Sequence, residues 1–197
     1  MTVVVKLGGS LLTLPGLAEK LRNILLMRSE HRCLIVIGGG ATTDVVREWS
    51  RIHQLSEEVA HWLALASLDL NIELLQKLLP YDYVRTRKEA AAIWSASTSP
   101  LFLRVSDFAQ AEEMAGGLLI PHDWSVTSDS MAAWITLRWP ADELLMLKSV
   151  PAPGGMTIEE ASRQQLVDDY FPRFADQIPH ISWCNLRAPK LEIERWL

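Results

Sequence analysis

Several features are scarce in this chain, and each scarcity argues against a class of protein. Only two cysteines, Cys33 and Cys184, occur among 197 residues. Neither lies in a CxxC pair, so we expect buried thiols in a reducing compartment rather than disulfides or metal ligands. The formal net charge of -5 offers no basic field for nucleic acid. The apolar runs, such as 144–147, are too short to span a membrane.

The beginning of the sequence lacks the basic segment and the apolar stretch of a secretory signal, so we expect a cytoplasmic protein. What the chain has in quantity is apolar residues, at 49% of the total. A chain of this length and composition can bury a sizeable core. We therefore expect one domain over residues 1–197.

Short apolar runs alternate with amphipathic stretches along the chain. The runs predict strands, and the stretches with helical spacing predict helices. Strands are expected at 3–7, 33–37, 82–87, 101–105, 143–148, 181–185 and 191–194, and helices at 17–28, 42–52, 56–79 and 131–139, with a short one from 157. This order predicts an α/β fold whose mainly parallel sheet is sandwiched by helices.

The longest expected helix begins after Ser56, a good N-cap, and ends before Pro80. One set of its apolar residues recurs at helical spacing: Val59, Leu63, Ala66, Leu70, Leu74 and Leu78. This face would lie in the core or form a surface between two copies of the chain.

Glycines end the first two predicted strands. Lys6-Leu-Gly-Gly-Ser10 follows the first, and Gly38-Gly39-Gly40 follows the second. Each alone indicates no more than a tight strand-to-helix turn. Together, at the carboxyl ends of adjacent parallel strands, they favour a phosphate site built from main-chain N–H groups. Neither GxGxxG with a downstream acid nor GxxxxGK[ST] occurs, which argues against a dinucleotide dehydrogenase and a P-loop nucleotidase.

A third motif, Thr127-Ser-Asp129-Ser-Met-Ala-Ala133, precedes the predicted strand 143–148. With the two glycine motifs, and in this order, it resembles the amino acid kinase family, over residues 1 to about 155. The resemblance implies ATP and Mg²⁺ as cofactors, a small-molecule substrate and a homo-oligomer, with the metal held largely by the nucleotide phosphates rather than by protein ligands.

The same resemblance implies a task for each matched residue. Lys6 would bind the transferring phosphoryl group and Asp129 would orient Lys6. An acid in the first turn of a helix also has a non-catalytic explanation, because it stabilises the helix there. The nucleotide side would comprise Gly8, Gly9, Ser10, Lys148 and Ser149, and the acceptor side Gly38, Gly39, Gly40, Asp123 and Thr127.

The sequence also departs from the family pattern. Many members carry a second catalytic lysine after a Gly-Met in the C-terminal part, whereas here Gly154-Gly155-Met156 is followed by Thr-Ile-Glu-Glu. Lys148 would supply that charge instead. The chain is shorter than most members, so we expect an acceptor-binding part at about 1–125 and a shortened nucleotide-binding part at about 126–197.

The stretch His122 to Trp134, with Lys148-Ser-Val, is similar to a narrower branch. That branch contains the aminomethylfuran phosphate kinase of methanofuran biosynthesis and bacterial relatives linked to one-carbon metabolism. It implies that Asp123 faces a substrate ammonium and that one of Arg85, Arg87 and Arg104 meets a substrate phosphate. Each arginine, and His122, has the alternative of a solvated side chain. Trp124, beside Asp123, is a further candidate for a substrate contact.

The sequence therefore predicts an ATP-dependent kinase of a small phosphorylated, amine-bearing acceptor. Two alternatives remain open. One is a kinase of another small carboxylate or phosphate. The other is a regulatory protein that binds a nucleotide without turnover.

Overall fold

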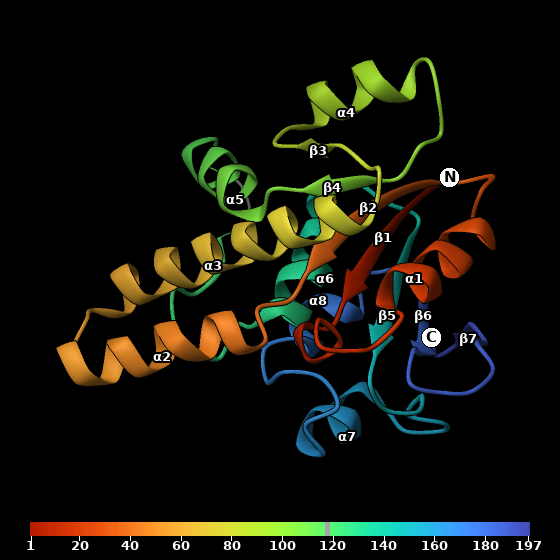
Figure 1. Cartoon of the computed structure of the whole chain (residues 1–197). Coiled ribbons are helices and arrows are strands. Elements are labelled where there is room, and N and C mark those ends of the chain that lie inside the picture. Colours follow the sequence, from red (N-terminus) through yellow and green to blue (C-terminus); the bar gives the residue numbers. More distant parts are fainter. Residues whose placement is uncertain (117–118) are drawn as a thin grey trace.

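A computed structural model describes residues 1–116 and 119–197. In these residues the strands form one seven-stranded sheet in the order β3-β4-β2-β1-β5-β6-β7 (Figure 1). The strands are β1 (Thr2–Leu7), β2 (Arg32–Ile37), β3 (Tyr83–Val84), β4 (Leu101–Leu103), β5 (Glu143–Lys148), β6 (Ile181–Asn185) and β7 (Glu194–Arg195). All neighbouring strands pair in parallel except β6 and β7, which confirms the mainly parallel sheet.

Strand β1 lies in the middle of the sheet and is buried on both faces. Its Val5 pairs with Ile35 of β2 on one side and with Leu145 of β5 on the other. A parallel sheet covered on both faces requires this continuous run of β-branched and apolar residues. The run therefore places the first glycine loop at the centre of the sheet's carboxyl edge.

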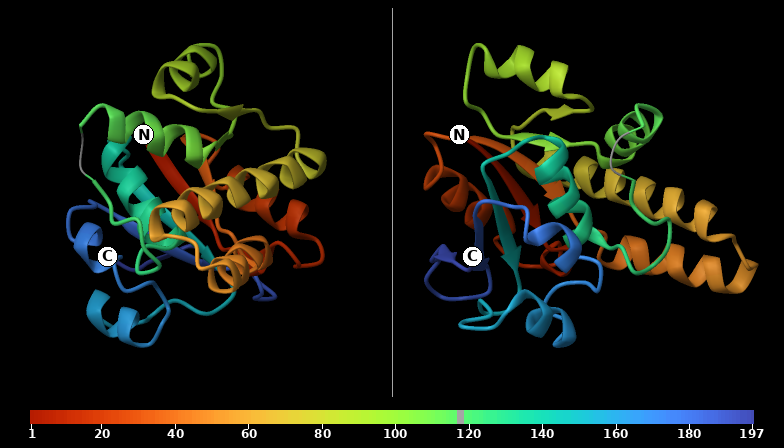
Figure 2. Two further views of the ribbon diagram at one scale, coloured as in Figure 1. Left: turned by 90° about the vertical axis from the view of Figure 1, so that its left-hand side faces the viewer. Right: turned by 180° about the vertical axis from the view of Figure 1, so that it is seen from behind.

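Helices cover both faces of the sheet (Figures 1 and 2). They are α1 (Leu17–Leu26), α2 (Ala41–His53), α3 (Glu57–Leu78), α4 (Arg87–Trp94), α5 (Val105–Met114), α6 (Ser128–Arg138), α7 (Ile158–Arg163) and α8 (Pro172–Ala175), with a 3-10 turn, η1 (Gly9–Leu11). One core packs α1 against Val3, Val5 and Leu7. The other packs α5, α6 and α8 against the face that carries Val4.

The side chains of β1 and β5 alternate between these two cores. Val4 of β1 and Met146 of β5 face α6, so Lys6 and Lys148, each two residues further on, lie on that same face. The two-residue repeat of side chains along each strand thus places both lysines next to the start of α6.

The segment from residue 82 to 116 differs from the prediction. The expected strands at 82–87 and 101–105 are shorter, because Arg87 already begins α4 and Val105 begins α5. The start of α4 carries a signal that the sequence analysis missed: Thr86 accepts a hydrogen bond from the Glu89 N–H, and the Glu89 carboxylate accepts one from the Arg85 N–H.

Helix α3 buries a different face from the expected set of six. All six residues, Val59, Leu63, Ala66, Leu70, Leu74 and Leu78, are exposed. The core face carries Leu65, Leu68, Ile72 and Leu75 instead. Because α3 is apolar on more than one side, its periodicity could not decide which stripe meets the sheet.

Both cysteines are buried and free, as predicted. Burial raises the pKa of Cys33 to about 12, so this thiol stays protonated. Among the described residues, none of the helices combines the length and the apolar character that crossing a bilayer requires.

Candidate functional site

The two glycine loops touch each other at the carboxyl edge of the sheet. A Cβ atom at Gly9 would lie 2.1 Å from the Gly40 nitrogen, and Gly40 itself has φ +55°. A side chain is excluded at Gly9 by contact, and one is strained at Gly40 by conformation. The contact brings η1 against the start of α2.

Asn71 of α3 holds the second loop in place. Its buried side-chain amide donates to the carbonyl oxygens of Gly38 and Gly39 at 3.0 and 2.9 Å. Thr42 also donates to the Gly39 oxygen, at 2.6 Å. Nothing in the helical spacing of α3 distinguished Asn71, because its partners lie 32 and 33 residues away in the sequence.

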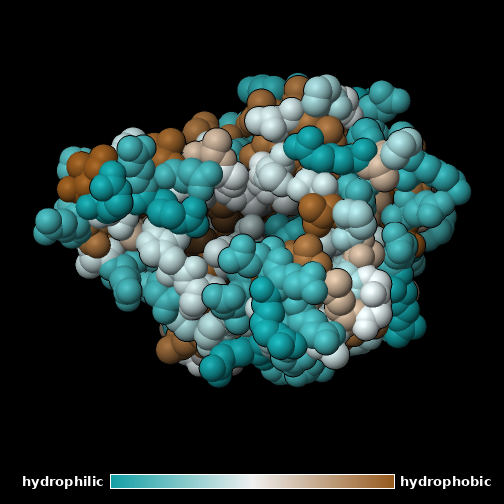
Figure 3. Space-filling model, turned by 90° about the horizontal axis from the view of Figure 1, so that it is seen from below, coloured by the Kyte–Doolittle hydropathy of each residue, from teal (hydrophilic) through white to brown (hydrophobic). Residues whose placement is uncertain are grey.

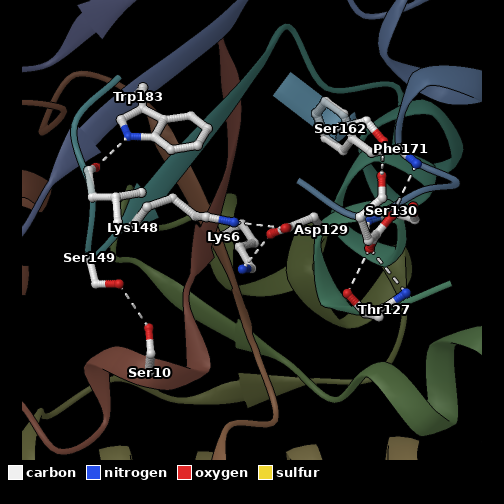
Figure 4. A network of polar contacts seen from close by, with 12 residues as sticks. Lys6, Ser10, Thr127, Asp129, Ser130, Lys148, Ser149, Ser162, Phe171 and Trp183 are labelled. Carbon is white, nitrogen blue, oxygen red and sulfur yellow. Dashed lines mark hydrogen bonds and ion pairs between the residues drawn. The ribbon is translucent and has the colours of Figure 1, made fainter. Parts of the chain in front are cut away.

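Lys6, Lys148 and Asp129 meet beside this junction (Figure 4). Asp129 Oδ1 lies 2.5 Å from Lys6 Nζ, and Asp129 Oδ2 lies 2.7 Å from Lys148 Nζ. The side chains of Lys6 and Asp129 are only 4% and 9% exposed. Two ammonium groups on one carboxylate leave an excess of positive charge at the end of the sheet, where a phosphoryl group would be stabilised.

The pKa values follow from this arrangement. Burial alone would raise the pKa of Asp129, but the two lysines outweigh it and hold that pKa below its ordinary value. Burial, followed by repulsion from Lys6, lowers the pKa of Lys148 to about 8, although Asp129 and Asp168 oppose the shift. Lys148 therefore loses its proton at a lower pH than an ordinary lysine.

Asp168 comes from the loop between α7 and α8 and binds the start of α6. Its Oδ2 accepts hydrogen bonds from the Thr127 hydroxyl at 2.7 Å and from the Thr127 and Ser130 N–H groups at 3.0 Å each. Its Oδ1 accepts from the Ser130 hydroxyl and the Phe171 N–H. Thr127 thus uses its hydroxyl to bind Asp168 rather than to cap α6 itself. The sequence analysis missed Asp168 because it lies 38 residues beyond Ser130.

On the β5 side, the loop after β1 meets the end of β5. The hydroxyl groups of Ser10 and Ser149 lie 3.2 Å apart, and Arg187 donates to the Ser10 carbonyl oxygen at 3.3 Å. The Trp183 ring of β6 lies 5.4 Å from Lys148 Nζ. These residues lie beside Lys6, Asp129 and Lys148, hereafter the triad, on the side opposite the second glycine loop.

On the β2 side, a pocket of about 210 Å³ opens between α2, α3 and the loop before α6. Its apolar lining includes Leu65, Leu68, Val126 and Met131, and its glycine end includes Gly39 and Gly40. Figure 3 views the molecule from below and shows that this side is hollowed, with hydrophobic residues inside a hydrophilic rim. The pocket is large enough for a small ring and its substituents.

The pocket lining also carries charged residues. Three are acidic, Asp44, Glu57 and Asp123, and one is basic, Arg47. Asp123 Oδ1 accepts hydrogen bonds from the Ser125 N–H and hydroxyl, which lower the pKa of Asp123 and keep it charged. The Arg47 guanidinium lies 4.7 Å from the Trp124 ring and 2.7 Å from Asp44.

The structure places the three arginines of the sequence analysis outside this pocket lining. Arg85 pairs with Asp107, Arg87 with Glu112, and Arg104 lies 3.5 Å from Asp69. Of the described residues that line the pocket, Arg47 alone is a lysine or an arginine. Sequence order did not reveal Arg47, which lies on α2 two turns beyond Gly40.

His122 is not a solvated loop residue. Its ring nitrogens lie 2.5 Å from Glu58 and 2.8 Å from Glu113, and its ring stacks on His61 with 4.0 Å between centroids. Burial would lower the pKa of His122, but the two carboxylates raise it overall. Through Glu58 and His61, His122 therefore links the loop that carries Asp123 and Trp124 to α3.

Comparison with known proteins agrees with this geometry. Residues 1–152 match the amino acid kinase family. The chain belongs to this family. It is 26% identical over 188 residues to [5-(aminomethyl)furan-3-yl]methyl phosphate kinase of Methanocaldococcus jannaschii, a match that covers 86% of this chain and 80% of the relative.

The fold is also shared with solved uridylate kinases. The uridylate kinase of Archaeoglobus fulgidus matches with a TM-score of 0.63 and 17% identity, over 93% of this chain and 90% of that one. The UMP kinase of Bacillus anthracis matches with a TM-score of 0.64 and 16% identity, over 95% and 88%. The family and the kinase relatives confirm that the chain is a phosphotransferase acting on a small molecule.

Proposed function

We propose that this kinase transfers the γ-phosphoryl group of ATP to the phosphate of a small, amine-bearing phosphomonoester, such as [5-(aminomethyl)furan-3-yl]methyl phosphate. A phosphate oxygen of the acceptor attacks the γ-phosphorus, the bond to the ADP oxygen breaks, and the acceptor leaves as a diphosphate. Such a product would belong to one-carbon cofactor metabolism.

The observation that supports the proposal is the composition of the pocket lining. Gly39 and Gly40 line it at the start of α2, where main-chain N–H groups would bind an anion. Leu65, Leu68, Val126 and Met131 give it apolar surface, and Asp44, Glu57 and Asp123 give it three carboxylates. An acceptor with a phosphate, a flat ring and an ammonium group complements these three kinds of residue. A dicarboxylate would meet repulsion from the three carboxylates.

The triad lies where the phosphoryl group would pass between nucleotide and acceptor. Lys6 and Lys148 would stabilise the charge that spreads over the equatorial oxygens, and Asp129 would hold both ammonium groups. The nucleotide would lie toward β5 and β6, with its phosphates at Gly9 and Ser10 and beside Ser149. The Gly8 N–H already donates to the Leu147 carbonyl oxygen at 2.9 Å, so Gly8 would shape this loop rather than bind a phosphate through its N–H group. The acceptor and the nucleotide would thus approach Lys6 from opposite sides of β1.

Mg²⁺ is expected with the nucleotide. Both oxygens of Asp129 are already engaged by lysines. The carboxylate of the triad is therefore poorly placed to bind a metal, and the nucleotide phosphates would hold Mg²⁺. The ion would neutralise charge on the β- and γ-phosphates.

The test compares two acceptors in two proteins. Asp123→Asn and the unmodified chain are assayed with the amine-bearing phosphate and with its analogue in which methyl replaces aminomethyl. We expect KM for the amine to rise about tenfold or more, with little change for the analogue, because one charged contact is lost. Asp107→Asn, which removes an acid outside the pocket, is the control.

Equal losses on both compounds would remove Asp123 from the acceptor site. Transfer only to carboxylates or to phosphates without an amine would favour the broader kinase reading. No transfer to any acceptor, with ATP still bound, would favour the regulatory reading.

We also propose that two copies of the chain associate through the exposed stripe of α3. Leu70 is 62% exposed, and Leu63, Leu74 and Leu78 continue the same apolar stripe. Apolar residues in such a row are costly to leave in water. Leu70→Glu should reduce the molar mass measured by light scattering, whereas Lys88→Glu, at an exposed position on α4, should not. An unmodified chain that remains monomeric at high concentration would contradict this.

A further inference from the structure

We infer that Asp168 is a positioning residue for phosphoryl transfer: it fixes the first turn of α6, and through that turn it sets Asp129 against Lys6 and Lys148. The inference rests on the proposed role of the triad. It adds a residue from the C-terminal part of the chain, beyond the matched residues 1–152.

Asp168 makes many contacts at the start of α6. Asp168 accepts five hydrogen bonds, four of them from Thr127 and Ser130. These two residues flank Ser128 and Asp129. A carboxylate that binds both sides of a helical turn fixes the backbone of the residues between them, so it fixes the direction in which Asp129 leaves α6.

Helix α6 has no side-chain cap from its own N-cap residue, Thr127. Ser56 and Thr86 cap α3 and α4 with their own hydroxyl groups, but Thr127 donates its hydroxyl to Asp168. The carboxylate of Asp168 therefore caps α6, as the hydroxyl groups of Ser56 and Thr86 cap α3 and α4. Without Asp168, the first N–H groups of α6 would lose their acceptor in a partly buried place.

Asp168 also acts on Lys148 through its charge. Lys148 is faced by Lys6 from β1, by Asp129 from α6, by the Trp183 ring from β6, and by the charge of Asp168 from the loop after α7. Asp168 opposes the repulsion between the lysines. Its removal would leave Asp129 as the one carboxylate near two ammonium groups among the described residues.

The experiment compares Asp168→Asn with Glu112→Gln in the full chain. Glu112 is a matched control because it is also a carboxylate that anchors α6, at the opposite end, through Arg138. NMR of ¹³C-labelled lysine side chains gives the titration midpoint of Lys148, with Lys148→Arg used to assign its signal. Turnover and KM are measured with ATP and the acceptor phosphate.

For Asp168→Asn we expect the titration midpoint of Lys148 to fall below its value in the unmodified chain. We also expect kcat to fall by about tenfold to hundredfold, because a small displacement of a reacting group is enough to slow the transfer. KM for ATP should change far less. Asp168→Glu, which keeps the charge, should restore part of kcat and most of the midpoint. Glu112→Gln should lower thermal stability and leave both the midpoint and kcat nearly unchanged.

An unchanged Lys148 midpoint and kcat in folded Asp168→Asn would overturn the inference. If that variant does not fold, a kcat for Asp168→Glu equal to that of the unmodified chain would overturn it. The NMR readout needs no acceptor, so a failure of the proposed substrate leaves this test intact. An Asp129→Asn variant with full turnover would refute the role of the triad itself, which separates the two failures.

Discussion

The starts of α2 and α6 lie at the same edge of the sheet and are built in opposite ways. The N-cap of α2 is Gly40, which has no side chain, and Gly9 packs directly against it. The carboxylate in the first turn of α2, Asp44, pairs with Arg47. The N-cap of α6 is Thr127, and the N–H groups of Thr127 and Ser130 are bound to the Asp168 carboxylate. N–H groups that no carboxylate binds can receive a phosphate, whereas a helix start whose N–H groups already bind a carboxylate repels one.

The difference shows how two helix starts at one edge of a sheet can serve two purposes, one to bind a ligand and the other to position a side chain. The start of α2 is open toward the pocket and suits a ligand. The start of α6 is satisfied by the protein and suits the placement of Asp129. Lys6 lies between the two, and changes that alter either start should have separable effects.

The largest effect is expected from Lys6→Ala, which removes the cation between the two helix starts. Turnover should fall by about 10²- to 10³-fold, because the charge acts mainly in the transition state. Nucleotide binding should weaken far less. Single-turnover kinetics and equilibrium binding separate the two quantities, and equal losses in both would assign Lys6 to ground-state binding.

A smaller but still large effect is expected from Gly9→Ala, which crowds the start of α2. The new methyl group would lie 2.1 Å from the Gly40 nitrogen, so the loops must separate. We expect a loss of about 1–3 kcal/mol in the free energy of unfolding and at least tenfold in turnover. Gly154→Ala is the control, since nothing lies within 4 Å of its Cβ position. Similar behaviour of the two variants would refute the tight junction.

The third prediction concerns pH. With its pKa near 8, Lys148 should lose its proton on the alkaline side, and turnover should fall with it. Lys148→Arg should move this fall to higher pH, because a guanidinium stays charged. A fall at the same pH in both proteins would assign it to another group.

The same group affects stability with a defined sign. From about pH 8 to the ordinary lysine pKa of 10.5, Lys148 binds a proton in the unfolded chain but not in the folded one. This lysine therefore makes the free energy of unfolding rise with pH across that window. Denaturant unfolding at several pH values, compared with Lys148→Met, measures the contribution.

The smallest effect is expected from Thr127→Ala, which removes one of the hydrogen bonds between α6 and Asp168. We expect a loss of about 1–2 kcal/mol in stability and a fall of a few fold in turnover. Ser56→Ala removes the cap of α3 and should cost about 1 kcal/mol with turnover unchanged. Equal turnover in the two variants would show that the start of α6 has no special role.

Much of the fold could be predicted from the sequence. The buried strands that became β1, β2, β5 and β6 follow from short apolar runs that end in glycine or a polar residue. The helices α1, α2, α3 and α6 follow from apolar stretches with helical spacing, and Ser56 also gives α3 a good N-cap. These signals are local, since a strand or a helix is specified by residues within a few positions of each other. The short elements between residues 82 and 116 were predicted least well, because their signals are brief.

The candidate site was predicted in part. Lys6, Asp129 and the glycine loops are brought together as their motifs suggested, and Lys148 joins them because strand alternation gives it the same face as Lys6. Arg47, Asn71 and Asp168 were not found. Each makes its decisive contact with residues from another element, and no spacing within the chain records that contact.

The sequence by itself determined the parallel sheet, the two glycine turns at its carboxyl edge and the presence of a lysine near the end of the first strand, because apolar periodicity and glycine act within one element. Only the tertiary structure decided which stripe of α3 is buried, which arginine lines the pocket, and which carboxylate holds α6. Those outcomes depend on packing between elements far apart in sequence, where burial and charge are set by neighbours that the chain order does not reveal.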